Sequence, residues 1–228
     1  MIKLIIFDWD DVFTLGAKEG YFACYHEALT SVGAHLPAEV EKQRILDTWS
    51  KPYPIQLSEL LKEHPDLVEK ACRSWESSYW GDVFVNSLRE VAGANELLVR
   101  LKQTYTLAIA TGNFPKMLKE RIFPHFHIPD VFAQIVSSWD NPDTAKSKPH
   151  PYMLETIMDR QQVSPDETIY VGDAKTDVEM AQNARVTPVV VLSGNLNREE
   201  ALALDVSYII DDVTSVETIL PTIQNLPL

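Results

Sequence analysis

Two carboxyl side chains follow the first apolar run of the chain. Asp8 and Asp10 come directly after Lys3–Phe7, and residues two apart on an extended strand point the same way, a rule that is only approximate at a strand end. One carboxylate can attack phosphorus as a nucleophile, and a second can protonate the leaving alcohol and then activate water. Acidic pairs are also common on solvated loops, so this spacing raises phosphoryl transfer as a hypothesis without deciding it.

A second acidic cluster follows another apolar run much later in the chain. Gly172 permits a tight turn, Asp173 then stands at the strand tip, and Asp177 lies about one helical turn further on. Acids gathered near one point repel one another unless a hard cation binds among them, and Mg²⁺ suits such oxygen ligands. A helix cap would explain Asp173 or Thr176 alone. It would not explain acids at two separate strand tips.

A lysine and a threonine complete the set of candidate residues. Lys148 precedes two prolines that hold its backbone extended and start a helix, and its amine can offset acid repulsion and hold a phosphate oxygen. Any lysine taken alone is more often a solvated surface residue, and we assign that role to Lys146. The Thr111 hydroxyl, with the backbone N–H groups of Gly112 and Asn113, can hold another phosphate oxygen, although a threonine here can equally be a helix cap.

The elements that must position these residues alternate along the chain. Short Ile- and Val-rich runs that end in polar residues suit strands buried on both faces of a parallel sheet. They are Lys3–Phe7, Thr106–Ala110, Gln134–Val136, Thr168–Val171, Thr187–Leu192 and Val206–Ile210. Helical spacing lies between them, in Ala94–Gln103, Pro115–Ile122, Pro151–Arg160, Thr176–Ala184, Arg198–Leu204 and Ser215–Ile223. The alternation predicts an α/β fold, a Rossmann-like doubly wound parallel sheet whose site lies at the carboxyl ends of the strands.

One region breaks the alternation. Residues 15–85 contain no convincing strand, and helical stretches are expected instead around Glu19–Ser31, Ala38–Thr48, Ile55–Lys62 and Asp66–Tyr79. Glycine and proline breaks separate these stretches. We therefore predict a core domain made of residues 1–14 and 86–228, with a small α-helical domain of residues 15–85 inserted after the first strand.

Four segments in this order resemble the haloacid dehalogenase superfamily of phosphotransferases. They are Phe7-Asp8-Trp9-Asp10, Ile109-Ala110-Thr111-Gly112, Lys148-Pro149-His150-Pro151 and Val171-Gly172-Asp173 through Asp177. Each motif is weak alone, but their order, strand-end placement and long spacings fit together. The insert looks like the helical cap of the phosphoglycolate phosphatase-like branch, in which the cap closes over the substrate and excludes water.

The resemblance implies a role for each residue. Asp8 would be the nucleophile and a Mg²⁺ ligand, and Asp10 the general acid/base, with its backbone carbonyl on the metal. Thr111 and Lys148 would hold the transferring phosphoryl group. Asp173 would bind Mg²⁺, with Asp177 as a ligand or an outer-shell orienter. The implied reaction is hydrolysis of a small phosphate monoester, of the phosphoglycolate or sugar-phosphate type, through an aspartyl-phosphate.

The chain departs from the family pattern at two places. Asp11 and Val12 stand where glycine and threonine usually follow the second aspartate, and Asp11 adds a negative charge near the phosphate site. Asp tolerates turn conformations better than most residues, so we expect the fold to survive and catalytic efficiency to be in question. Arg185 stands where a glycine commonly ends the helix after Asp177, a departure that we interpret as structural.

The predicted cap would set substrate specificity. The segment Trp49-Ser50-Lys51-Pro52-Tyr53-Pro54 is a proline-stiffened loop with a cation and two aromatic residues, and Tyr25, His26 and Arg44 are further candidates. For each, packing or solvation is the stronger interpretation, and Lys51 is only a weak substrate-binding candidate. A small cap favours a small organic phosphate over a phosphoprotein.

The amino-acid composition argues against two classes of binding partner. Twenty Lys and Arg against 33 Asp and Glu give a formal charge of −13, which argues against nucleic acid or an anionic membrane as a general partner. No apolar run approaches the ~20 residues that cross a bilayer. Two cysteines and a start without a signal-peptide pattern favour a cytoplasmic location. The oligomeric state stays open between monomer and homodimer.

Other functions remain open at this stage. A phosphomutase of the same family would share every core residue and would need a bisphosphorylated activator. A 2-haloacid dehalogenase also uses an aspartate nucleophile, but it needs no metal and lacks the second aspartate, so Asp10 argues against it. A phosphonate hydrolase would need a Schiff-base lysine, such as Lys18 or Lys51. A non-catalytic binding protein of this fold is favoured only by Asp11.

Overall fold

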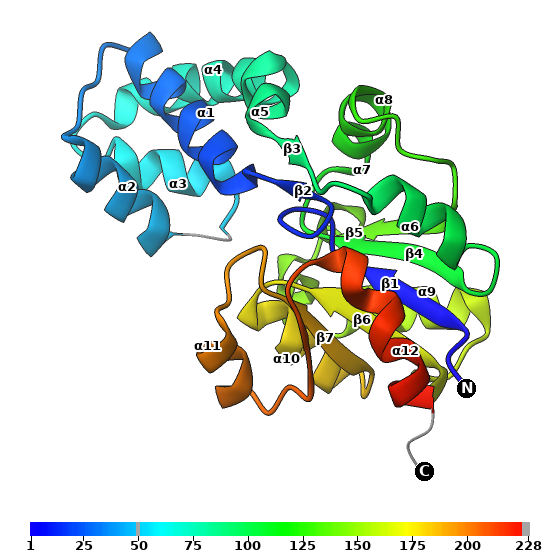
Figure 1. The fold of residues 1–228 in the computed structure, drawn as a ribbon. Helices are drawn as coiled ribbons and strands as arrows, with labels where there is room; N and C mark the ends of the chain where they lie inside the picture. Colours follow the sequence, from blue (N-terminus) through cyan, green and yellow to red (C-terminus); the bar gives the residue numbers. More distant parts are fainter. Residues whose placement is uncertain (49–50, 225–228) are drawn as a thin grey trace. The chain divides into compact units, whose positions relative to one another are not determined.

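A computed structural model describes residues 1–48 and 51–224 of the chain. Residue contacts divide it into two compact units, one made of Met1–Leu15 and Glu90–Leu228 and the other of Gly16–Arg89. The first unit carries the main sheet, and the second is built mainly of helices (Figure 1).

The main sheet of the first unit is parallel throughout the described part of the chain. Its spatial order is β5-β4-β1-β6-β7-β8. The bounds are β1 Leu4–Phe7, β4 Thr106–Thr111, β5 Phe132–Ser137, β6 Thr168–Gly172, β7 Thr187–Val191 and β8 Tyr208–Ile210. The short strands β2 (Thr14–Leu15) and β3 (Arg89–Glu90) form a separate two-stranded sheet. The main sheet confirms the predicted α/β fold.

Helices cover the sheet because its strands are apolar on both faces. Leu4 and Ile6 pack with Tyr170 and with residues of α9 and α10 on one side. Ile5 and Phe7, which alternate with them, are also fully buried, as the pleat requires for a strand covered on both faces. The core helices are α6 Ala94–Leu101, α9 Tyr152–Gln161, α10 Lys175–Asn183, α11 Arg198–Ala203 and α12 Val216–Gln224 (Figure 1).

The register brings the polar strand ends together. Phe7 pairs with Ile109 of β4 on one side and with Val171 of β6 on the other. The residues after these positions therefore emerge at one edge of the sheet, since parallel strands share their carboxyl end.

One predicted helix is interrupted. Pro115–Ile122 was expected to be a single helix, but α7 (Pro115–Met117) passes into a π-helical segment, Leu118–Ile122, and then into α8 (Phe123–His125). Pro124 stands within this stretch and has no backbone N–H, so an unbroken ladder of i→i−4 bonds cannot run through it.

The second unit is organised around aromatic side chains. Trp75 of α4 stacks on Tyr53 with ring centroids 4.2 Å apart and on Tyr79 at 4.8 Å. Phe84 of α5 lies 4.8 Å from Tyr79. Its helices are α1 Ala17–Ser31, α2 Ala38–Asp47, α3 Tyr53–Leu60, α4 Val68–Trp80 and α5 Asp82–Ser87.

Candidate active site

An ion-paired cluster lies at the carboxyl edge of the sheet. The Lys148 ammonium lies 2.8 Å from Asp8 Oδ2 and 2.7 Å from Asp177 Oδ1. Asp8 follows β1, and Asp177 lies in the first turn of α10, after β6. Burial lowers the pKa of the Lys148 ammonium, but the carboxylates of Asp177 and Asp8 outweigh it and raise that pKa above its ordinary value. Lys148 therefore remains a cation among these acids.

Three acids of this cluster lie close enough together to offer oxygen ligands to one metal ion. Asp8, Asp173 and Asp177 each offer a carboxylate oxygen, and these oxygens lie within 4.8 Å of one another. Asp8 Oδ1 is buried and has no hydrogen-bond partner among the described residues. An all-oxygen donor set with an unsatisfied buried carboxylate oxygen fits Mg²⁺, which takes carboxylates together with phosphate oxygens.

The electrostatics of the cluster also favour a cation. Burial raises the pKa of Asp8 from 3.8 to about 6, Lys148 opposes the rise and Asp177 adds to it. Burial and the charges of Asp177 and Asp8 raise the pKa of Asp173 from 3.8 to about 8, against the hydrogen bonds from Asn195. Both carboxyl groups hold protons more tightly than in water, and a divalent cation would displace those protons.

Asp177 already has a full set of hydrogen-bond partners. Its Oδ2 accepts from the backbone N–H groups of Asp173 and Ala174, both at 3.1 Å. Its Oδ1 lies 2.7 Å from Lys148 Nζ and 3.0 Å from the Tyr170 hydroxyl. Four contacts use the acceptor positions of a carboxylate. Although Asp177 is close enough to contribute an oxygen, these contacts favour the orienting role over direct ligation.

Asn195 holds Asp173 in place. Asp173 Oδ2 accepts from the Asn195 backbone N–H at 2.8 Å and from its side-chain amide at 2.6 Å. Two glycines make room for these acids: a Cβ on Gly172 would lie 2.6 Å from the Asp177 side chain, and one on Gly194 would lie 2.1 Å from Asp173 Oδ2. Gly172, the last residue of β6, is predicted to allow a turn, and it also allows Asp177 to approach the backbone.

Asp10 faces the loop after β4. Its carboxylate oxygens lie 3.2 and 3.0 Å from the side-chain nitrogen of Asn113. Removal of this carboxyl from water raises its pKa well above 3.8, the charges of Asp8 and Asp11 raise it further, and the Asn113 amide lowers it. A carboxyl group with a raised pKa can hold the proton that a general acid must deliver.

The Thr111-Gly112-Asn113 segment is ordered by its own hydrogen bonds. Thr111, the last residue of β4, is fully buried, and its hydroxyl accepts from the Asn113 backbone N–H at 3.0 Å. The Asn113 N–H, which was predicted to hold a phosphate oxygen, is thus engaged within the loop. Its role in phosphate binding, like those of Thr111 and Gly112, stays a prediction.

The structure accounts for Asp11 in conformational terms. Asp11 has φ 58°, in the left-handed region that glycine usually occupies. Its backbone N–H donates to the Thr14 carbonyl at 2.7 Å, and its own carbonyl accepts from the Ser193 hydroxyl at 2.9 Å. These bonds hold the turn in a conformation that Asp tolerates better than most residues.

Comparison with known proteins identifies the family. The model of the haloacid dehalogenase-like hydrolase family matches residues 5–191. The chain belongs to this family. The match includes all the clustered acids and Lys148, and it confirms the resemblance seen in the four motifs.

Individual relatives agree with the family. A phosphoglycolate phosphatase of Vibrio vulnificus is 28% identical over 53% of this chain and 52% of its own length. The chain thus spans about half the length of that relative. A phosphoglycolate phosphatase of Vibrio parahaemolyticus is 23% identical over 94% of both chains. A solved structure from Haemophilus somnus, described as a predicted phosphoglycolate phosphatase, has a TM-score of 0.79 at 22% identity and covers 96% of this chain and 97% of its own.

Sequence reasoning missed several residues that support this haloacid dehalogenase-like site. They are Asn195 and Gly194 beside Asp173, the side chain of Asn113 beside Asp10, and Tyr170 beside Asp177. Ser193-Gly194 follow a strand, so their place at the site edge was visible in the sequence. The side-chain direction of Asn113 and the buried hydroxyl of Tyr170 had no such signal.

The candidate cap residues are engaged within their own unit. Arg44 pairs with Glu63 at 2.9 Å and donates to the Leu60 carbonyl at 3.1 Å. His26 Nδ1 lies 3.2 Å from the Glu41 carboxylate.

The aromatic candidates of this unit are partners of its core. Tyr25 is buried, with its ring centroid 5.8 Å from that of Trp75. The Tyr53 hydroxyl donates to Glu76. Lys51 is exposed, and its substrate role stays a prediction, while Trp49 lies outside the described residues.

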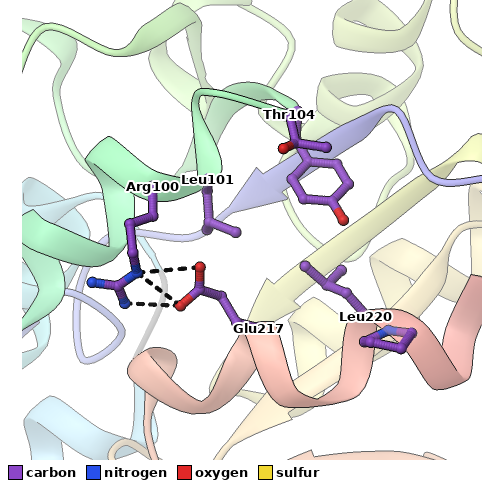
Figure 2. Close-up of a pocket in the computed structure, with 7 residues that line it drawn as sticks. Arg100, Leu101, Thr104, Glu217 and Leu220 are labelled. Carbon is purple, nitrogen blue, oxygen red and sulfur yellow. Dashed lines mark hydrogen bonds and ion pairs between the residues drawn. The ribbon is translucent and has the colours of Figure 1, made fainter.

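A cavity lies at the other end of the sheet. It has a volume of about 340 Å³, and Figure 2 shows the Arg100–Glu217 ion pair beside Leu101 and Leu220 in its lining. Tyr105, which also lines it, directly precedes β4, whereas Thr111 ends this strand. At about 3.3 Å per residue the two are roughly 20 Å apart, so this cavity is separate from the acidic cluster.

Among the described helices, none has the length and apolar character needed to cross a membrane.

Proposed function

We propose that the chain is a magnesium-dependent phosphatase that hydrolyses a small phosphate monoester through an aspartyl-phosphate on Asp8. The arrangement that carries this proposal is the Lys148 ammonium between Asp8 and Asp177, with Asp173 beside them. It sets a potential nucleophile, a fixed cation and oxygen ligands for a metal around one point, where a phosphoryl group needs all three.

In the first half-reaction a carboxylate oxygen of Asp8 attacks phosphorus while the bond from phosphorus to the ester oxygen breaks. The carboxyl group of Asp10 gives its proton to that leaving oxygen, so the alcohol departs neutral. The Lys148 ammonium stabilises the negative charge on the phosphoryl oxygens.

In the second half-reaction the ionised Asp10 takes a proton from water. The resulting hydroxide oxygen attacks phosphorus, the bond to Asp8 breaks, and inorganic phosphate leaves. Asp8 returns to a carboxylate, and Asp10 is again protonated for the next substrate.

Asp8, Asp173 and the backbone carbonyl of Asp10 would hold Mg²⁺, with Asp177 as the orienting residue. When bound, the ion would supply positive charge to the phosphoryl oxygens and to the acids around it. A metal ion held in this way would bind the unsatisfied Oδ1 of Asp8 and would leave the hydrogen bonds of Asp177 intact.

The substrate class follows from the relatives and from the second unit. Relatives named phosphoglycolate phosphatase support a small phosphorylated metabolite of the phosphoglycolate or sugar-phosphate type. We propose that residues 15–85 act as a cap that excludes water during the reaction, with Lys51 as a candidate substrate contact. A cytoplasmic location is also proposed, from the unpaired thiols of Cys24 and Cys72.

The experiment is a hydrolysis assay with a nitroaryl phosphate, followed by a panel of phosphometabolites. We expect turnover that requires Mg²⁺ and is lost on chelation and in Asp8→Asn. Turnover that persists in Asp8→Asn would reject the aspartyl-phosphate. A wild-type protein without turnover on any ester would favour a binding role instead. A requirement for a bisphosphorylated activator would identify a mutase.

A further inference from the structure

We propose that Asn113 is a positioning residue for the general acid/base: its side-chain amide fixes the orientation of the Asp10 carboxyl group. This inference rests on the proposed function. It concerns the side chain of Asn113, whereas the sequence predicts a role only for its backbone N–H.

The contact restrains the carboxyl group as a whole. One nitrogen, Asn113 Nδ2, lies 3.2 Å from Asp10 Oδ1 and 3.0 Å from Oδ2. A donor shared by both oxygens resists rotation of the carboxyl group, because rotation lengthens at least one of the two contacts. Asn113 is itself 1% exposed, so water does not replace this donor easily.

The orientation of the amide is fixed by a second bond. Asn113 Oδ1 accepts from the Phe114 backbone N–H at 2.8 Å. A flipped amide would place an oxygen against the Asp10 carboxylate and a nitrogen against an N–H donor, so the network admits one orientation.

Donors from the end of β5 anchor the loop that carries Asn113. The Ser137 hydroxyl donates to the Asn113 carbonyl at 2.7 Å, and the Trp139 indole N–H donates to the Gly112 carbonyl at 2.9 Å. Trp139 also stacks on Phe114, with ring centroids 4.0 Å apart. The residues at the end of β5 thereby restrain the loop backbone, and the loop in turn positions the Asn113 amide against the Asp10 carboxyl group.

This restraint suits both proton transfers. When Asp10 is protonated, the amide donates to one oxygen and the other carries the proton toward the leaving oxygen of the ester. When Asp10 is ionised, the same arrangement leaves an oxygen available to take the proton from water. The efficiency of each transfer depends on this geometry.

The test compares two esters that differ in their need for an acid. A nitroaryl phosphate has a weakly basic leaving group, whereas an alkyl phosphate such as glycerol phosphate needs its oxygen protonated. The parameter is kcat/KM, which covers the steps up to formation of the aspartyl-phosphate. We expect Asn113→Ala to lower kcat/KM about 30- to 100-fold for the alkyl ester and less than about threefold for the nitroaryl ester.

A double-mutant cycle separates positioning from general damage. In an Asp10→Asn background, Asn113→Ala should cost little further on the alkyl ester, because the group that it positions is gone. Asn95→Ala is the matched control, since the Asn95 amide donates to the Phe126 carbonyl at 3.0 Å in the same unit, and it should leave the ratio of the two esters unchanged. If Asn113→Ala does not fold, Asn113→Leu has a similar size, lacks the donor, adds no charge and should give the same selectivity.

Equal losses on both esters, or an undiminished cost in the Asp10→Asn background, would overturn the inference while leaving phosphatase activity intact. If the wild-type protein hydrolyses neither ester, the proposed function fails, and this inference fails with it.

Discussion

A Cβ atom on residue 194 would lie 2.1 Å from Asp173 Oδ2, so only glycine at this position lets Asp173 occupy its place in the cluster. Asp173 cannot retreat freely, because the backbone and side chain of Asn195 both hold the same oxygen. We predict that Gly194→Ala displaces Asp173 and weakens Mg²⁺ binding about 10- to 100-fold, as for other changes next to metal ligands. Titration calorimetry with Mg²⁺ measures the effect.

Gly33→Ala is the control for this variant. A Cβ on Gly33 meets open space, although its φ of 73° makes any side chain strained. It should lower stability and leave the Mg²⁺ dissociation constant unchanged. Wild-type Mg²⁺ affinity in Gly194→Ala would contradict the prediction.

Substitutions of Lys148 and of Lys146 should have very different effects on stability and activity, although the two lysines are only two residues apart. Lys148→Met removes the cation shared by Asp8 and Asp177, and we expect a loss of about 3 kcal/mol in the unfolding free energy without metal, since both buried acids lose their ion-pair partner. Activity should fall at least about 100-fold. The Lys146 ammonium lies 5.1 Å from the centroid of the Tyr152 ring, and Lys146→Met should cost at most about 1 kcal/mol and leave activity unchanged. Denaturant unfolding and steady-state assays distinguish the two, and equal effects would contradict the assignment.

Stability and Mg²⁺ binding should depend on pH in opposite ways. The pKa of Asp8 is raised to about 6 and that of Asp173 to about 8, from 3.8. Between pH 4 and 8 the folded state therefore holds protons that the unfolded state has lost, so the metal-free protein loses stability as the pH rises through this range. Mg²⁺ competes with those protons and should stabilise more at pH 8 than at pH 5.5.

The measurement is thermal unfolding with and without Mg²⁺ at the two pH values. At pH 8 and free Mg²⁺ one hundred times Kd, stabilisation of about 2.7 kcal/mol should raise Tm by roughly 5–10 °C. Asp173→Asn should remove most of the shift. An equal or larger shift at pH 5.5 would contradict the linkage.

Asp11 should influence the acid/base residue through its charge. Its carboxylate raises the pKa of Asp10, so Asp11→Asn should move the limb of the pH–rate profile that reports Asp10 to lower pH, and salt should screen this effect. Asn also tolerates the left-handed conformation at φ 58°. The kcat/KM profile at low and high salt tests this, since the displacement should shrink with salt. A profile identical to wild type would assign Asp11 a conformational role alone.

The sequence predicted the sheet and the strand-end residues because both depend on local patterns. Lys3–Phe7 and Thr168–Val171 are apolar runs bounded by polar residues, and parallel pairing carries their ends to one edge. The order of the motifs associates Asp8, Lys148 and Asp173 from the sequence alone.

The supporting contacts could not be predicted in the same way. The bond between Asn113 and Asp10 joins residues 103 positions apart, and it depends on the rotamer of a side chain in a turn. The interrupted helix after Pro115 is a smaller failure of the same kind: apolar spacing predicted a regular helix over Pro115–Ile122, but Leu118–Ile122 is π-helical, next to Pro124, which has no backbone N–H to donate. Residue spacing predicts where the backbone of each residue lies, whereas packing determines which groups its side chain contacts.

Arg185 provides a test of backbone strain away from the chemistry. It follows α10 with φ 60°, in the left-handed conformation that commonly ends a helix at glycine. The Val186 N–H reaches back to the Ala181 carbonyl at 2.8 Å, and the Arg185 N–H reaches the Gln182 carbonyl at 3.0 Å, so the turn closes the helix whichever residue occupies it. Arg185→Gly should raise the unfolding free energy by about 0.5–1 kcal/mol. The gain is the relieved backbone strain, reduced by the greater conformational entropy of glycine in the unfolded chain.

Arg185→Ala separates strain from side-chain contacts. Alanine keeps the left-handed penalty and removes the guanidinium, so its stability should stay within about 0.5 kcal/mol of wild type, as for most surface substitutions. Both variants should keep wild-type kcat/KM, since Asp177 lies at the opposite end of α10 and is held by the backbone of Asp173 and Ala174. Denaturant unfolding at constant pH measures both. A destabilised Arg185→Gly would mean that contacts of the arginine side chain outweigh the strain of its backbone.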